Sequence, residues 1–82
     1  MKKYYALDYV NKLECELVYN DQLYLTEEEA EAARSKMRRP DLFDVTWYTL
    51  QDLQDDVFDG AQIMITDDLK VKVIAQYEYE DI

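Results

Sequence analysis

The chain has 82 residues, of which 49% are hydrophobic and 13% are aromatic, and its formal net charge at pH 7 is −10. A chain of this length forms a single domain, residues 1–82, whose small core excludes a deep substrate cavity, and its apolar content argues against disorder. The acidic field repels nucleic acid and anionic membranes and speeds encounter with basic partners.

Tyrosine-rich residues 3–10 and residues 13–19 are predicted to form two strands joined by a hairpin loop at Asn11 and Lys12. The second strand alternates apolar and acidic positions, which is typical of a half-buried strand. Its inward positions would be Leu13, Cys15, Leu17 and Tyr19. Apolar residues also recur at helical spacing here, so a helix over residues 5–18 is the alternative; we prefer the hairpin.

After a turn at Asn20 and Asp21 and a short extended piece at residues 22–25, residues 26–40 carry the signals of a helix. Thr26 and Glu29 have the spacing of a capping box. Acids fill the first turn, bases fill the last, and Pro40 ends the run, as the helix dipole and proline geometry favour. An apolar stripe for packing on a sheet consists of Ala30, Ala33 and Met37.

The second half predicts a strand over residues 43–48, a short amphipathic helix beginning after Thr49 and ending near Gly60, and two further strands at residues 61–65 and 69–79. The apolar positions of this helix are Leu50, Leu53, Val57 and Phe58. The element order β-β-α-β-α-β-β predicts an α+β fold, with a mostly antiparallel sheet and two helices packed on one face.

Several classes of chemistry are excluded by residues that the chain lacks. It has no His, so the usual general base and commonest zinc ligand are missing. The single Gly60 cannot build a phosphate-binding loop, and the lone Ser35 lies in a basic helix end without a partner. A calcium loop at residues 55–66 fails at its third and twelfth positions. We therefore predict no catalytic, cofactor-binding or metal-binding residues and no enzymatic activity.

The sequence also indicates where the protein is located and what Cys15 and the basic residues 34–39 do. No stretch has the length of a signal peptide core or a membrane span, so we expect a cytoplasmic protein. Cys15 falls at an inward strand position, where a free Cys acts as a small hydrophobe. The bases at residues 34–39 suit the negative end of a helix dipole, so direct nucleic-acid binding is not expected.

The negative charge is concentrated in the second half. Residues 1–40 contain 8 acids and 7 bases, whereas residues 41–82 contain 11 acids and 2 bases. On an α-helix, aspartates at residues 52, 55, 56 and 59 would be mutually repelling neighbours, which suggests a surface kept for binding; a merely solvated face is the alternative. The predicted partner-binding residues are Asp41, Asp44, Asp52, Asp55, Asp56, Asp59, Asp67, Asp68, Glu78, Glu80 and Asp81.

These features predict a non-enzymatic acidic protein that binds and inhibits a basic nucleic-acid-binding protein or nuclease, with carboxylates in place of DNA phosphates. By charge class alone, it has the general character of the small acidic proteins by which phages and mobile elements block restriction or CRISPR nucleases; a phage-encoded copy would act in the host cytoplasm. The alternatives are an immunity or antitoxin protein that plugs one basic nuclease toxin, and a structural or regulatory domain whose charge serves solubility.

Overall fold

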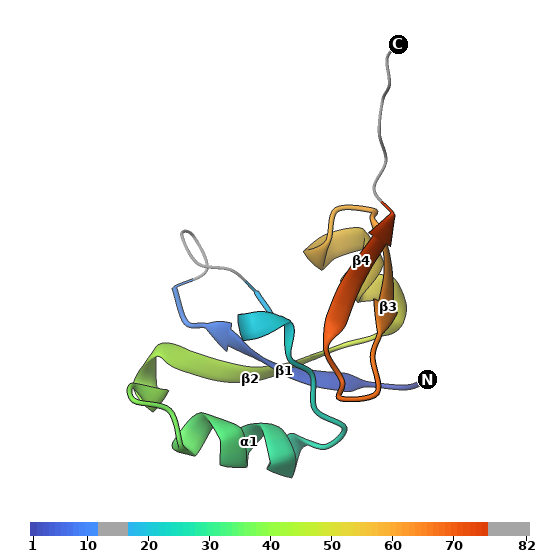
Figure 1. Ribbon diagram of the computed structural model, residues 1–82. Helices are drawn as coiled ribbons and strands as arrows, with labels where there is room; N and C mark the ends of the chain where they lie inside the picture. Colours follow the sequence, from blue (N-terminus) through green and yellow to red (C-terminus); the bar gives the residue numbers. More distant parts are fainter. Residues whose placement is uncertain (12–16, 76–82) are drawn as a thin grey trace.

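The computed structural model describes residues 1–11 and 17–75 (Figure 1). Its elements in chain order are β1 (Tyr4–Tyr9), a 3₁₀ turn (Tyr19–Asp21), α1 (Glu27–Ser35), a second 3₁₀ turn (Pro40–Leu42), β2 (Phe43–Tyr48), α2 (Leu50–Asp52), a π-helical turn (Leu53–Val57), β3 (Gln62–Ile65) and β4 (Val71–Ala75). The predicted α+β class, with antiparallel strands and two helical segments, is confirmed.

The strands form two antiparallel ladders. In the first, β1 pairs with β2 so that Tyr5 lies opposite Trp47 and Leu7 lies opposite Val45. In the second, β3 pairs with β4, with a register irregularity near Gln62. β2 has the predicted bounds, and β3 and β4 lie within the predicted strands at residues 61–65 and 69–79; residues 76–79 of the last one lie outside the described residues.

Residues 22–24 connect the two ladders. Tyr24 and Tyr5 exchange backbone hydrogen bonds of 2.8 Å in both directions, and the N–H of Leu23 donates to the carbonyl of Leu69 at 2.8 Å. Single bridges therefore join this segment to β1 on one side and to the residue before β4 on the other. The lateral order is β2, β1, residues 22–24, β4 and β3.

The two helical segments lie on opposite sides of β1, so the prediction that they share one face is wrong. Leu7 packs with Ala30 of α1, whereas the preceding Ala6 packs with Leu53 of the π-helical turn. Successive strand residues point to opposite faces, which separates the two clusters. The core therefore has two parts, one between α1 and the β1–β2 ladder and one between the two ladders.

The predicted first hairpin is corrected in its pairing. β1 pairs with β2, and residues 17–19 bend into a 3₁₀ turn instead of continuing a strand. The rest of that predicted strand, including Cys15, lies outside the described residues. The alternative helix over residues 5–18 is also wrong, because its first part is β1.

α1 confirms the strongest local prediction, although it is shorter than residues 26–40 suggested. The Thr26 hydroxyl accepts a hydrogen bond from the Glu29 N–H at 3.1 Å, which caps the helix. The helix ends at Ser35, and Pro40 begins the following 3₁₀ turn. Ala33 and Met37 pack beside Ala30 against the sheet, as the apolar stripe predicted.

Candidate partner-binding surface

The segment of residues 49–60 carries four of the predicted aspartates, and its start is fixed by a complete capping box. The Thr49 hydroxyl accepts from the Asp52 N–H at 3.1 Å, and the Asp52 carboxylate accepts from the Thr49 N–H at 3.2 Å. Asp52 is half-buried, so its carboxylate has a local structural task. The predicted cap at Thr49 is confirmed, with Asp52 as its reciprocal partner.

The regular α-helical row of aspartates does not form. Only Leu50–Asp52 is α-helical, and a π-helical turn follows, in which the Phe58 N–H donates to the Leu53 carbonyl at 2.9 Å. Asp59 and Gly60 then adopt left-handed conformations, with φ of 55° and 84°. The wider π turn changes the spacing of the side chains, so the predicted i, i+3, i+4, i+7 neighbours are not aligned on one α-helical face.

Three exposed carboxylates nevertheless remain close in sequence at this end of the molecule. They belong to Asp55, Asp56 and Asp59. Asp55 accepts a hydrogen bond from the Gln51 side chain at 2.6 Å. Within residues 1–11 and 17–75, none of the three forms an ion pair with Lys or Arg. We call these three residues the acidic turn.

Asp41, in the 3₁₀ turn before β2, and Asp44, the second residue of β2, lie apart from the acidic turn. Asp41 forms an ion pair with Arg39, with 3.2 Å between nitrogen and oxygen, and this hydrogen-bonded contact lowers the pKa of Asp41. Asp44 is exposed on β2, opposite Asp8 in the ladder. Of the predicted pair, Asp41 is therefore ion-paired with Arg39, whereas Asp44 forms no ion pair with a described residue, although its charge interacts with Arg34.

Asp67 and Asp68 occupy the turn between β3 and β4. The Thr66 hydroxyl donates to the Asp68 carboxylate, which lowers the pKa of Asp68. The acidic turn precedes β3 and this turn follows it, so they lie at opposite ends of the ladder (Figure 1). The remaining predicted residues, Glu78, Glu80 and Asp81, lie outside the described residues.

Asp8 is the carboxylate that sequence reasoning missed. It is fully buried and accepts hydrogen bonds from the Val18 N–H at 2.8 Å, from the Thr46 hydroxyl at 2.9 Å and from the Tyr48 hydroxyl. The alternation of β1 carried a usable signal, because Asp8 shares a face with the fully buried Ala6. Its three hydrogen-bond donors are ten or more residues away in the sequence, so no local pattern predicts these contacts.

The contribution of this buried cluster to stability can be tested through the ionisation of the Tyr48 hydroxyl at alkaline pH. Burial, and then the hydrogen bond to Asp8, raises the pKa of Tyr48. A pKa raised on folding contributes stability that is fully present below the unfolded pKa, about 10 for tyrosine, and is lost as pH rises from there towards the folded pKa. We expect urea unfolding between about pH 9 and about pH 11 to show a shallower alkaline loss for Tyr48→Phe. Identical pH slopes in both proteins would contradict this assignment.

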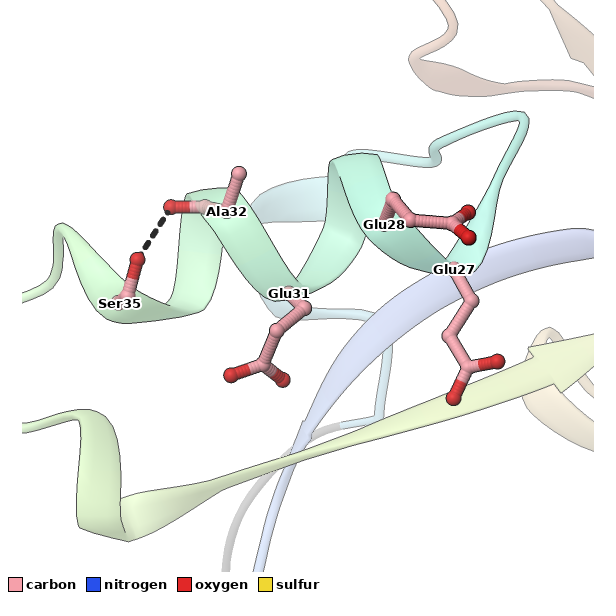
Figure 2. A pocket seen from close by; sticks show the side chains of 5 residues that line it. All are labelled: Glu27, Glu28, Glu31, Ala32 and Ser35. Atoms are coloured by element: carbon pink, nitrogen blue, oxygen red, sulfur yellow. Dashed lines mark hydrogen bonds between the residues drawn. The ribbon is translucent and has the colours of Figure 1, made fainter.

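A hollow on the outer surface of α1 is also acidic. It is lined by Glu27, Glu28, Glu31, Ala32 and Ser35 (Figure 2). All five side chains come from the same helix, and the Ser35 hydroxyl donates a hydrogen bond to the Ala32 carbonyl at 2.9 Å. Arg34 also pairs with Glu31 at 2.8 Å, so part of the charge near this hollow is neutralised. The hollow is an open helix surface rather than an enclosed site.

The described residues contain neither a cluster of metal ligands nor a membrane-spanning helix. Within residues 1–11 and 17–75, no three His, Cys, Asp or Glu side chains are placed to hold a metal ion together. In the same ranges, no helix has the length and apolar character to cross a bilayer. Comparisons with protein-family models, curated proteins and solved structures found no match to this chain.

Proposed function

We propose that this protein is a non-enzymatic acidic binding protein that occupies a basic, nucleic-acid-binding surface on another protein and so inhibits it. The observation that carries the proposal is the acidic turn. Its carboxylates, from Asp55, Asp56 and Asp59, are exposed and form no ion pair with a described Lys or Arg. Both ion pairs found in the described chain lie between residues 31 and 41.

Mimicry of a nucleic acid depends here on charge density rather than on helical register. Duplex DNA carries one charge per roughly 1.7 Å of axis, and a basic groove evolved for it attracts any dense group of anions. The π-helical turn breaks the even spacing, but it keeps Asp55 and Asp56 adjacent and exposed, with Asp59 in the turn that follows. A cationic surface gains affinity and association rate from such a group.

The test is displacement of a labelled DNA duplex from a panel of basic nucleases and DNA-binding proteins. We expect displacement from at least one of them, weakening as salt rises because the contact is electrostatic. The triple variant Asp55→Asn, Asp56→Asn, Asp59→Asn should displace about tenfold less effectively. Its free energy of unfolding should be unchanged or slightly higher, because crowded carboxylates repel one another.

A matched control neutralises three carboxylates elsewhere. Glu27→Gln, Glu28→Gln, Glu29→Gln removes the same charge from the first turn of α1 and should displace the duplex like the wild type. Equal loss in both triple variants would show that only net charge matters. Displacement of a single panel member at very high affinity would favour an immunity protein. No displacement at low salt would leave a domain whose charge serves solubility.

A further inference from the structure

β2 presents an open sheet edge. It is the outermost strand of its ladder, and in the described part of the chain no strand pairs with its other side. The pairing of Tyr5 shows which backbone groups of β2 point outward. The N–H and C=O of Tyr5 both bond to Tyr24, so they point away from β2. Bonded and non-bonded pairs alternate along an antiparallel ladder. The N–H and C=O groups of Val45 and Trp47, opposite Leu7 and Tyr5, consequently point out of the open edge.

This edge lacks most of the devices that usually protect such strands, and Asp44 is its one charged residue. β2 has six residues in regular register and contains neither Lys nor Pro. The other outer strand, β3, has four residues and a register irregularity at its start. Short length, irregular pairing, Lys and Pro all discourage strand addition, so β2 is the edge that accepts another strand more readily.

The side chains that flank this edge favour cations. On one face, Trp47 is 47% exposed, and Lys3 of the same chain places its Nζ 4.5 Å from the centre of the indole ring, a contact that a cation of the partner would have to replace. On the other face, Asp44 is exposed; its charge interacts with Arg34 of the same chain, but it forms no ion pair with a described Lys or Arg. A neighbouring strand with a cation opposite Asp44 and another over Trp47 matches both faces.

We infer that an extended segment of the basic partner docks on the open edge of β2 as an added strand, with two Arg or Lys residues three positions apart. The inference rests on the proposed function, which supplies the positive charge of the partner. A second copy of this chain is disfavoured as the occupant, because each copy has a net charge of −10. Backbone hydrogen bonds provide the affinity of strand addition, and the flanking side chains provide its specificity.

The probe is an eight-residue peptide of Val and Thr with two Arg residues three positions apart, mixed with the full chain. We expect the amides of Val45 and Trp47 to gain protection from hydrogen exchange when the peptide binds. The same peptide, N-methylated at alternate amides on its pairing edge, keeps its charges and should bind about tenfold more weakly. This comparison uses the wild-type protein, so it does not depend on the folding of a variant.

A substitution tests the same edge from the protein side. Val45→Pro removes an outward N–H without removing a β1–β2 hydrogen bond, so it should weaken binding of the unmethylated peptide by about tenfold. Val45→Thr keeps the N–H and the branched shape and should bind like the wild type. Melting curves of both variants confirm that folded protein is compared.

Two results would overturn the inference. Equal binding of the methylated and unmethylated peptides would mean that charge alone attracts them. A dimer in sedimentation, with Val45 and Trp47 already protected before peptide is added, would assign the edge to a second copy. If the peptide test fails but the protein displaces the DNA duplex, only the docking site on β2 is rejected. If the protein displaces no duplex, the proposed function is rejected, whatever the result with the peptide.

Discussion

Replacing Asp8 with alanine should lower the free energy of unfolding by about 3 kcal/mol, because each buried donor left without a partner costs about 1 to 3 kcal/mol. The lost partners are the Val18 N–H and the hydroxyls of Thr46 and Tyr48. The two hydroxyls belong to half-buried residues and can turn towards water, whereas the Val18 residue is fully buried. Most of the cost therefore arises at Val18.

Val18 also makes this contact structurally demanding. Its φ of 55° lies in the left-handed region, which a β-branched residue rarely adopts, and Asn20 and Asp21 follow in the same region. Such a backbone persists only where surrounding contacts hold it. The Asp8 carboxylate holds the Val18 amide directly, so its removal should also loosen residues 17–21.

Urea unfolding, with hydrogen exchange of residues 17–21, measures both effects. Asp44→Ala is the matched control, because Asp44 is the cross-strand neighbour of Asp8 but is exposed. It should change stability by no more than about 0.5 kcal/mol. Asp8→Asn should lie between the two, since its amide oxygen still accepts one hydrogen bond. Equal unfolding midpoints for Asp8→Ala and the wild type would show that the buried carboxylate is dispensable.

The features predicted correctly from the sequence are those determined by neighbouring residues. The cap at Thr26 lies three residues from its partner amide, and the alternation of Phe43, Val45 and Trp47 lies within one strand. Gly60 has the left-handed φ that its place after a helix predicted. Each of these signals is complete within a few residues, so tertiary contacts did not have to be known.

The features that sequence reasoning missed depend on contacts between distant residues. Turn chemistry at Asn11 suggested a hairpin, whereas the partner strand that the structure shows for β1 begins at Phe43, more than thirty residues further along the chain. Aspartate spacing assumed an α-helix, whereas packing of Leu53 and Phe58 accompanies a π-helical turn. The sequence consequently predicted which aspartates belong to the candidate surface, but it did not predict how the π-helical turn arranges them.

Leu53 joins the two ladders, and its truncation should have the other large effect on stability. It is fully buried and packs in one cluster with Ala6 of β1, Ile63 of β3 and Val71 of β4. A two-stranded ladder is marginal in water, so each ladder depends on this shared cluster. Leu53→Ala removes buried apolar groups and leaves a cavity, which costs about 2 to 5 kcal/mol.

Leu50→Ala provides the comparison, because Leu50 lies one turn earlier and is 44% exposed. Its truncation should cost less than about 1 kcal/mol, since little apolar surface leaves the core. In Leu53→Ala, hydrogen exchange should accelerate in β1–β2 and β3–β4 together, because the same side chain supports both. Faster exchange confined to β3–β4, or equal unfolding midpoints for the two variants, would mean that the ladders are stabilised independently and that residues 22–24 alone connect them.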